Sequence, residues 1–136
     1  MTDVVIHVVA GALFDASGRV LIAQRPAGKH MAGGWEFPGG KLEPGEDRWL
    51  GLQRELREEL GVEALSGRPV IAYEHAYPTR RTYLDLWLVT EFSGSPSSLE
   101  GQPLQWLPLE ALKNAGLLEA DWPMIAALQQ ALTPSS

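Results

Sequence analysis

A glutamate-rich stretch between residues 40 and 62 constrains this chain more than any other segment. It reads GKLEPGEDRWLGLQRELREELGV, and from Asp47 to Leu60 its apolar residues recur with the period of an α-helix. Four of them form one stripe that can pack on a sheet: Trp49, Leu52, Leu56 and Leu60. Gly61 follows at the position where glycine commonly ends a helix. We therefore predict an amphipathic helix from Asp47 to Leu60.

Three glutamates of this helix converge on a face beside the apolar stripe. Glu55, Glu58 and Glu59 are spaced i, i+3 and i+4, so three like charges lie within one turn. They also lie near the negative end of the helix dipole, which favours cations. Mg²⁺ and Mn²⁺ prefer such oxygen ligands and commonly share them with substrate phosphates. The pattern predicts a metal site, and a solvated face with pairs through Arg54 and Arg57 is the alternative.

The whole-chain numbers are typical of a small soluble enzyme. A length of 136 residues suits one domain with a buried core, and we expect residues 1–136 to form it. The formal net charge of -6 argues against binding to polymeric nucleic acid, although metal ions can still bring a nucleotide to acidic residues. The absence of cysteine excludes disulfides and thiol catalysis. No apolar stretch could span a membrane, so we expect a cytoplasmic monomer or homodimer.

The rest of the chain predicts strands on both sides of this helix and another helix at the end. The expected strands are His7–Phe14, Val20–Gln24, Pro69–Tyr77, Thr82–Phe92 and Leu104–Leu107. Residues 15–19 have the composition of a hairpin loop, and Pro108–Lys113 that of a helical turn. The last helix runs from Asp121 to Leu132, and residues 131–136 are expected to fray. This order of elements predicts an α/β sandwich.

The glutamate-rich stretch also fits a fixed frame. The frame is Gly40, five residues, Glu46, seven residues, Arg54-Glu55-Leu56, one residue, Glu58-Glu59, one residue and Gly61-Val62. This is the complete signature of the Nudix hydrolases, which the chain resembles over nearly its whole length. The resemblance implies the Nudix fold, a mixed β-sheet sandwiched between α-helices, and hydrolysis of a phosphoanhydride bond in a nucleotide.

Four islands outside the signature resemble the MutT branch, whose members hydrolyse 8-oxo-dGTP to the monophosphate and pyrophosphate. They are Arg25 with His30-Met31-Ala32; Glu36-Phe37-Pro38-Gly39-Gly40; Pro78 and Arg80 with Trp87-Leu88-Val89; and Glu100-Gly101-Gln102-Pro103 with Trp106. Family members that act on CTP and related pyrimidine triphosphates are the alternative. Nudix-fold binding modules without catalysis are another, but they usually have damaged signatures, and every acidic position is present here.

The resemblance also implies a metal site and a general base. Mg²⁺ ions, with Mn²⁺ as a substitute, would be held by Glu55, Glu58, Glu59, Glu100 and the backbone carbonyl of Gly39. One glutamate beside the bound water would act as the base in an attack on the β-phosphorus; we favour Glu55, with Glu100 as the alternative. Arg54 is expected to pair with Glu46 or another signature carboxylate and hold the loop and helix in shape.

Substrate contacts are implied for four further residues. Arg25 and Arg80 are candidates for binding phosphate or a purine oxygen, since a guanidinium presents rigid paired donors. Phe37 would offer an apolar surface beside the base, and Asp121 would accept hydrogen bonds from guanine N1–H and N2–H₂. The alternatives are surface charges for the arginines, a core aromatic for Phe37 and a helix N-cap for Asp121. Glu100 could likewise be an ordinary loop residue.

Overall fold

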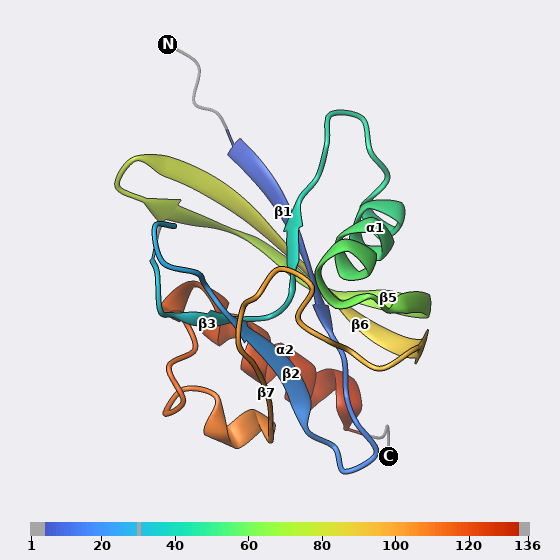
Figure 1. The fold of residues 1–136 in the computed structure, drawn as a ribbon. Coiled ribbons are helices and arrows are strands. Elements are labelled where there is room, and N and C mark those ends of the chain that lie inside the picture. The colour runs from blue at the N-terminus through green and yellow to red at the C-terminus, as the bar shows by residue number, and fades with distance from the viewer. Residues whose placement is uncertain (1–4, 30, 134–136) are drawn as a thin grey trace.

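The computed structural model describes residues 5–29 and 31–133, in which the strands form two sheets (Figure 1). The larger sheet has the order β4-β1-β6-β5. Its strand β1 (Val5–Ala12) is antiparallel to β4 (Gly39–Lys41) and parallel to β6 (Arg80–Ser93). The long strand β5 (Glu63–Tyr77) is antiparallel to β6 and forms a hairpin with it. The sheet is therefore mixed, as the sequence predicts.

The smaller sheet is antiparallel and has the order β3-β2-β7. It consists of β3 (Trp35–Glu36), β2 (Val20–Gln24) and β7 (Leu104–Leu107). The predicted hairpin loop between β1 and β2 is confirmed, because Asp15 N donates to Arg19 O at 2.9 Å. Its two strands nevertheless enter different sheets, and this places the two sheets next to each other.

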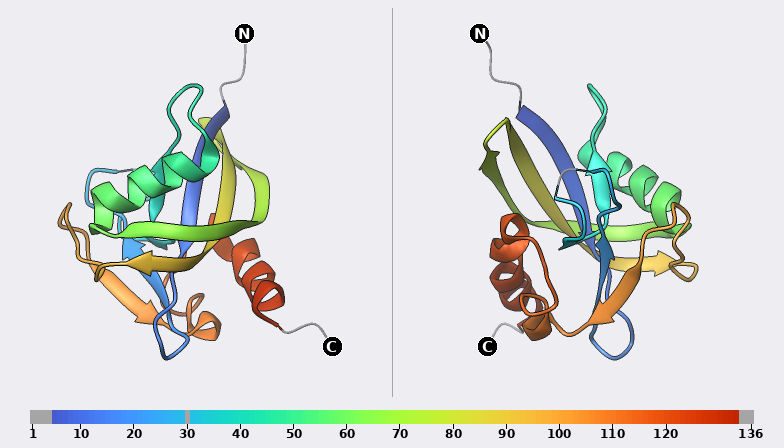
Figure 2. Two further views of the ribbon diagram at one scale, coloured as in Figure 1. Left: turned by 90° about the vertical axis from the view of Figure 1, so that its right-hand side faces the viewer. Right: turned by 60° about the vertical axis from the view of Figure 1, so that its left-hand side comes forward.

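Helix α1 (Arg48–Leu60) and helix α2 (Trp122–Leu132) cover opposite faces of the larger sheet (Figure 2). The predicted stripe of α1 is confirmed: Leu52, Leu56 and Leu60 are fully buried. They pack with Val9 and Val89 on one face of the sheet. The other face packs on α2 in a cluster that includes Ala10, Leu84, Leu86, Met124 and Leu128. Two short 3₁₀ helices precede α2, namely η1 (Leu109–Ala111) and η2 (Glu119–Asp121).

Both ends of α1 are capped, and the predicted end at Gly61 is confirmed. The Asp47 side chain caps the first turn by accepting from Leu50 N, and Gly61 ends the helix with φ 70°. The loop after β6 then binds the carboxyl end of the helix, since Ser97 N donates to Leu60 O at 3.0 Å. The helix is therefore fixed at the end that carries its glutamates.

Some predicted element boundaries were wrong. Strand β5 begins at Glu63 and not at Pro69, because its first part is interrupted by register shifts around Ser66 and Gly67 that remove the alternating pattern. Strand β1 ends at Ala12, and Phe14 forms only an isolated bridge with Val20. Strands β3 and β4 were not expected, since they are only two and three residues long. Residues 131 and 132 belong to α2; His30 and residues 134–136 lie outside the described residues.

None of the helices in the described ranges is long and apolar enough to cross a membrane.

Candidate active site

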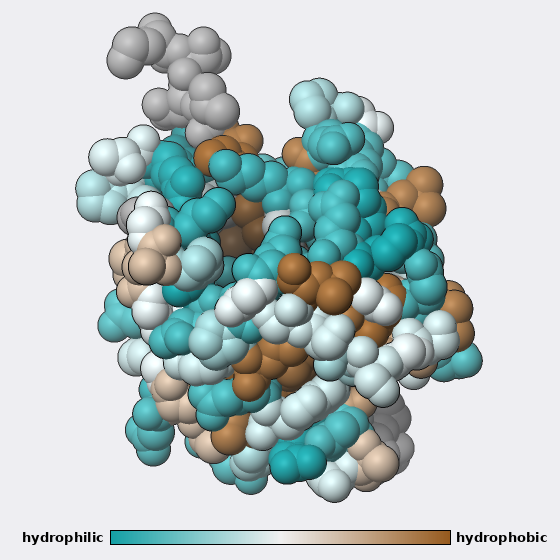
Figure 3. Space-filling model, viewed as in Figure 1, coloured by the Kyte–Doolittle hydropathy of each residue, from teal (hydrophilic) through white to brown (hydrophobic). Residues whose placement is uncertain are grey.

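A pocket of about 460 Å³ lies on the α2 side of the larger sheet, and residues from both sheets and from α1 line it. Its floor consists of alternate residues of β1 and β6, whose side chains share one face of the sheet: Ile6, Val8, Ala10, Thr82 and Leu84. Figure 3 shows a hollow with an apolar base and a hydrophilic rim, between the β5–β6 hairpin and α1. The pocket therefore combines an apolar floor with charged walls.

Two glycines bring carboxylates of α1 to this pocket. A Cβ atom on Gly40 would lie 2.4 Å from Glu55 Oε2, so only a residue without a side chain lets Glu55 approach β4 this closely. A Cβ on Gly39 would meet the Val9 carbonyl oxygen of β1 at 2.0 Å. The backbone N–H of Gly39 donates to Glu59 Oε2 at 2.9 Å. Glu55 and Glu59 consequently both line the pocket.

The two other predicted glutamate ligands, Glu100 and Glu58, differ in their position relative to the pocket. Glu100 lines the pocket beside Glu55 and Glu59, because Leu99 N donates to Glu59 O at 3.0 Å and draws the loop onto α1. Glu58 does not line it; its side chain is 55% exposed and lies 3.3 Å from Arg54. The structure thus brings three of the four predicted glutamates together with Gly39 and leaves Glu58 beside them.

The environment of these carboxylates is unusual for ionised groups. Burial raises the pKa of Glu59 to about 8, and the negative charges of Glu55, Glu36 and Glu100 add to this increase. Burial also raises the pKa of Glu55, against the opposing effect of Arg54. The described residues contain no group of three His, Asp or Glu side chains already arranged to hold a metal ion. Glu55 and Glu58 instead contact Arg54.

Arg54 has the predicted pairing with Glu46. Its Nε and Nη2 atoms donate to the two carboxylate oxygens of Glu46 at 2.7 and 2.9 Å. Hydrogen bonds from Arg54 and the backbone lower the pKa of Glu46 to about 2. Gly51 lies beside this pair, and a Cβ there would meet Leu42 at 2.2 Å and Glu46 at 3.0 Å. Arg54 therefore joins the segment before α1 to the helix while it also contacts Glu55.

Asp121 also lines the pocket and is only 7% exposed. It occupies the N-cap position of α2, but its side chain makes no capping hydrogen bond. Its carboxylate accepts from the backbone N–H of Phe37 at 3.3 Å. Burial, together with the charge of Glu36, raises the pKa of Asp121 to about 7. The N-cap alternative therefore does not account for this carboxylate.

The remaining predicted substrate residues also line the pocket. Arg25 Nε donates to Glu36 Oε2 at 3.0 Å. Phe37 is 3% exposed and is part of the apolar core as well as the pocket wall. The Arg80 guanidinium lies 5.5 Å from the centre of the Tyr77 ring. Within the described part of the chain, Arg80 Nε is buried and has no hydrogen-bond partner.

Several lining residues had no role predicted from the sequence, namely Lys29, Glu36, Lys41 and Tyr77. Glu36 and Lys41 flank the Phe37–Gly40 segment, so their positions could have suggested a role. No motif in the sequence marks Tyr77, because its place in the pocket depends on the pairing of β5 with β6.

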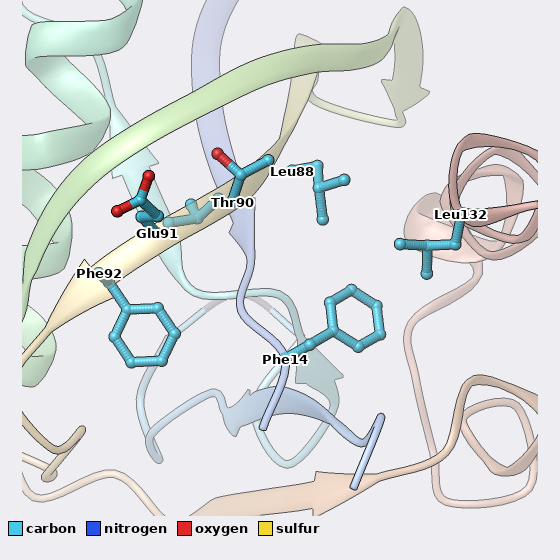
Figure 4. A pocket seen from close by; sticks show the side chains of 7 residues that line it. Phe14, Leu88, Thr90, Glu91, Phe92 and Leu132 are labelled. Atoms are coloured by element: carbon cyan, nitrogen blue, oxygen red, sulfur yellow. The ribbon is translucent and has the colours of Figure 1, made fainter. Parts of the chain in front are cut away.

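A second pocket lies between β6 and the end of α2 (Figure 4). Its lining consists of Phe14, Leu88, Val89, Thr90, Glu91, Phe92 and Leu132. Glu91 supplies the charged side chain of this described lining, which therefore lacks the mixed charges expected for binding a metal and phosphates. The first pocket is the candidate active site.

Comparison with known proteins agrees with this geometry. The NUDIX domain family matches residues 9–127. The CTP pyrophosphohydrolase of Escherichia coli (strain K12) is 42% identical over 119 residues, which cover 88% of both chains. The 8-oxo-dGTP diphosphatase of the same organism is 34% identical over 125 residues, or 92% of this chain and 97% of that protein. The solution structure of the E. coli ORF135 protein superposes with a TM-score of 0.84 at 39% identity, covering 98% of this chain and 96% of that one.

The α/β fold and the glutamate-bearing helix beside a Gly–Gly strand define the class of the protein. The chain belongs to the NUDIX domain family. The resemblances to the Nudix hydrolases and to 8-oxo-dGTP diphosphatases are confirmed, as is the predicted fold class.

Proposed function

We propose that the protein is a Mg²⁺-dependent nucleoside triphosphate pyrophosphohydrolase that acts on the cytoplasmic nucleotide pool and releases a monophosphate and pyrophosphate. One observation carries this proposal: a single pocket is lined both by the carboxylates of Glu55, Glu59 and Glu100 and by the buried Asp121. Nudix hydrolases act on nucleotides and generally use a divalent metal. A nucleotide can lie along the apolar floor with its phosphates beside the glutamates and its base beside Asp121.

The metal in this proposal is held by Glu55, Glu58, Glu59, Glu100 and the carbonyl of Gly39. The donors are the hard oxygens that Mg²⁺ prefers, and the repulsion that helps to raise the pKa of Glu59 is the kind a bound cation relieves. Glu55 and Glu58 would exchange their contacts with Arg54 for the ion. When bound, the ion neutralises phosphate charge and lowers the pKa of a bound water.

The chain's own residues supply the remaining chemistry. We assign the general base to Glu55, which the backbone of Gly40 approaches closely, with Glu100 as the alternative. The base takes a proton from water as the water attacks the β-phosphorus. Arg54 keeps the loop before α1 attached to the helix through its paired bonds to Glu46. Arg80 offers a buried donor to a phosphate or base oxygen, and Arg25 lines the same pocket.

We assign base recognition to Asp121 and Phe37, and the preferred substrate to 8-oxo-dGTP. In its ionised form Asp121 accepts hydrogen bonds, and guanine presents two donors, N1–H and N2–H₂, along one edge. Phe37 contributes an apolar surface in the same wall. The relative named 8-oxo-dGTP diphosphatase supports this choice.

Cytosine nucleotides are the second candidate. The relative named CTP pyrophosphohydrolase has the higher identity, 42% against 34%. The raised pKa of Asp121, about 7, also leaves part of its carboxyl protonated near neutral pH. A protonated carboxyl can donate to cytosine N3 and accept from its exocyclic amine.

The test is kcat/KM with Mg²⁺ for 8-oxo-dGTP, dGTP, CTP and 5-methyl-dCTP, together with identification of the products. We expect monophosphate and pyrophosphate, with 8-oxo-dGTP hydrolysed most efficiently. The Asp121→Ala variant should lose more efficiency with guanine than with cytosine substrates, while Glu91→Gln, in the second pocket, should match the wild type. A better rate with CTP or 5-methyl-dCTP would transfer the assignment to cytosine. No pyrophosphate from any of these nucleotides would contradict the proposal and favour a binding module.

A further inference from the structure

The segment that carries Asp121 is attached to both sheets. Its main chain pairs with β3 of the smaller sheet: Trp35 N donates to Gly116 O at 3.1 Å, and Leu118 N donates to Trp35 O at 2.9 Å. The side chain of Leu118 occupies the space beside Gly34, where a Cβ atom would lie 2.2 Å from Leu118 Cδ2. The smaller sheet therefore fixes the beginning of this segment.

The end of the segment packs in the apolar core and also accepts a hydrogen bond from the larger sheet. Tyr73 of β5 donates its O–H to the carbonyl oxygen of Ala120 at 2.5 Å. Burial raises the pKa of Tyr73, so the hydroxyl keeps its proton and remains a donor. Tyr73 is paired with Leu84 of β6, and residues directly opposite in antiparallel strands share a face of the sheet. Leu84 is part of the pocket floor.

Tyr73 therefore connects the sheet that forms the floor to the residue next to Asp121. Asp121 itself is bonded on its other side, through Phe37 N, to the chain that leaves β3. We infer that Tyr73 is a positioning residue that sets the height of the Asp121 carboxylate above the pocket floor and thereby controls discrimination between nucleobases. This inference rests on the proposed role of Asp121 in reading the base.

The physical reason is the steep dependence of hydrogen bonding on geometry. A site built to bond particular donors rejects an analogue that lacks them only if its acceptor is held in place. Without the Tyr73 hydroxyl, η2 can shift relative to the floor, and a carboxylate with more freedom accepts a wider range of bases. A tether that only stabilised the fold would lower the rates with all nucleotides by the same factor.

The experiment compares the wild type, Tyr73→Phe, Asp121→Ala and the double variant. The measured quantity is the ratio of kcat/KM between the best and the poorest nucleotide among 8-oxo-dGTP, dGTP, CTP and 5-methyl-dCTP. We expect Tyr73→Phe to lower this ratio by about three- to tenfold, the range for losing one hydrogen bond. In the Asp121→Ala background the same substitution should change the ratio no further, because the two residues act as one unit. Melting temperatures of all four proteins show whether each is folded.

The matched control is Tyr83→Phe, since Tyr83 lies on the opposite face of the larger sheet and packs edge-on against His7; its ratio should equal that of the wild type. Ratios of Kd for the monophosphate products, measured without Mg²⁺, test the same discrimination independently of catalysis. If Asp121→Ala changes the ratio and Tyr73→Phe does not, the inference is wrong and the proposed function stands. If Asp121→Ala leaves the ratio unchanged, base reading by Asp121 fails, and the role of Tyr73 fails with it.

Discussion

Glu59 combines burial with the charges of three neighbouring carboxylates, and both raise its pKa to about 8. We predict that Glu59→Gln and Glu58→Gln each lower kcat by at least ~100-fold, the range for losing a principal electrostatic group in catalysis. Each substitution removes one charged ligand and almost preserves the size of the side chain. Steady-state kinetics at saturating Mg²⁺ measure the effect. Turnover near the wild-type rate in both variants would contradict the metal assignment.

Asp121 leads to a prediction about pH. Its carboxyl, with a pKa raised to about 7, is mainly protonated below that pH and mainly ionised above it. The protonated form suits cytosine and the ionised form suits guanine, so the kcat/KM ratio of guanine to cytosine nucleotides should rise about tenfold or more from pH 6 to pH 8. Asp121→Asn should make the ratio independent of pH. A flat ratio in the wild type would show that Asp121 does not titrate against the base.

Most candidate residues could be found in the sequence because their order and spacing carry the signal. Eight of the residues predicted to bind metal or substrate line one pocket: Arg25, Phe37, Gly39, Glu55, Glu59, Arg80, Glu100 and Asp121. Tyr73 and Tyr77 could not be found in this way, since their positions follow from the register of a hairpin and not from a local motif. The partners of Arg54 were predictable because they lie within one helix and the loop before it.

Helix α1 and the loop before it form one unit through Arg54, whose side chain is 24% exposed beside Glu46. We predict that Arg54→Ala lowers kcat by about tenfold or more, as is usual for residues that orient ligands, and also lowers the Tm. The expected loss arises because the Glu46 carboxylate loses its paired donors and Glu55 loses one contact. Arg57→Ala is the control on the same helix, since the Arg57–Glu63 pair is exposed. Lost activity with an unchanged Tm would instead indicate that Arg54 contacts phosphate directly.

A buried carboxylate of the larger sheet binds the first residue of α1. Asp85 of β6 is fully buried, accepts from Arg48 Nε and Nη2 at 2.6 and 2.8 Å, and lies 2.9 Å from His7 Nε2. Burial alone would raise the pKa of Asp85, but the hydrogen bonds from Arg48 and His7 outweigh it and lower that pKa. The ionised Asp85 therefore stabilises the fold fully above the unfolded-state pKa of its carboxyl. This stabilisation is lost as the pH falls through the lower folded-state pKa.

We predict that Asp85→Asn lowers the free energy of unfolding by about 1–3 kcal/mol at pH 7, as expected when a buried hydrogen-bonded charge is lost. The difference from the wild type should shrink at acidic pH. Urea unfolding at several pH values measures it, with Glu74→Gln as the control because the Glu74–Arg81 pair is exposed. A pH-independent difference would mean that Asp85 acts by packing and not by charge.

Among the helices and strands, the sequence predicted best those elements in which one face is uniformly buried. The apolar stripe of α1 and Gly61 at its end predicted that helix well. The start of β5 could not be predicted, since its register shifts remove the period-2 pattern. Strands β3 and β4 are also too short to show a period; tertiary pairing with β2 and β1 creates them.

Over the whole molecule, the candidate site lies where the two sheets and the end of α1 meet. The order of elements predicted an α/β sandwich. The division of the strands into two sheets was not predictable, because it depends on which edges pair after β1 and β2 separate. That division nevertheless creates the pocket, since its floor belongs to the larger sheet and Asp121 is held partly by the smaller one.

In the proposed function, the clustered carboxylates also link metal binding to the stability of the whole protein. Mg²⁺ should raise the Tm, because an ion that binds only the folded state stabilises it by mass action. The raised pKa of Glu59, about 8, means that without metal this group holds a proton near neutral pH and must release it to become a ligand. The increase in Tm at a fixed Mg²⁺ concentration should therefore be larger at pH 8.5 than at pH 6.5.

The metal-free protein should show the opposite trend with pH. A carboxyl whose folded-state pKa lies above its unfolded-state value contributes stability at low pH that is lost as the pH rises through about 8. Glu59→Gln should remove this loss and stabilise the metal-free protein at pH 8.5 by at least about 1 kcal/mol, since one pKa unit corresponds to about 1.4 kcal/mol. It should also remove most of the increase in Tm caused by Mg²⁺, whereas Glu91→Gln should change neither. Thermal melts with and without Mg²⁺ at both pH values measure these effects. An equal Mg²⁺-induced increase in the wild type and Glu59→Gln would mean that the ion binds elsewhere.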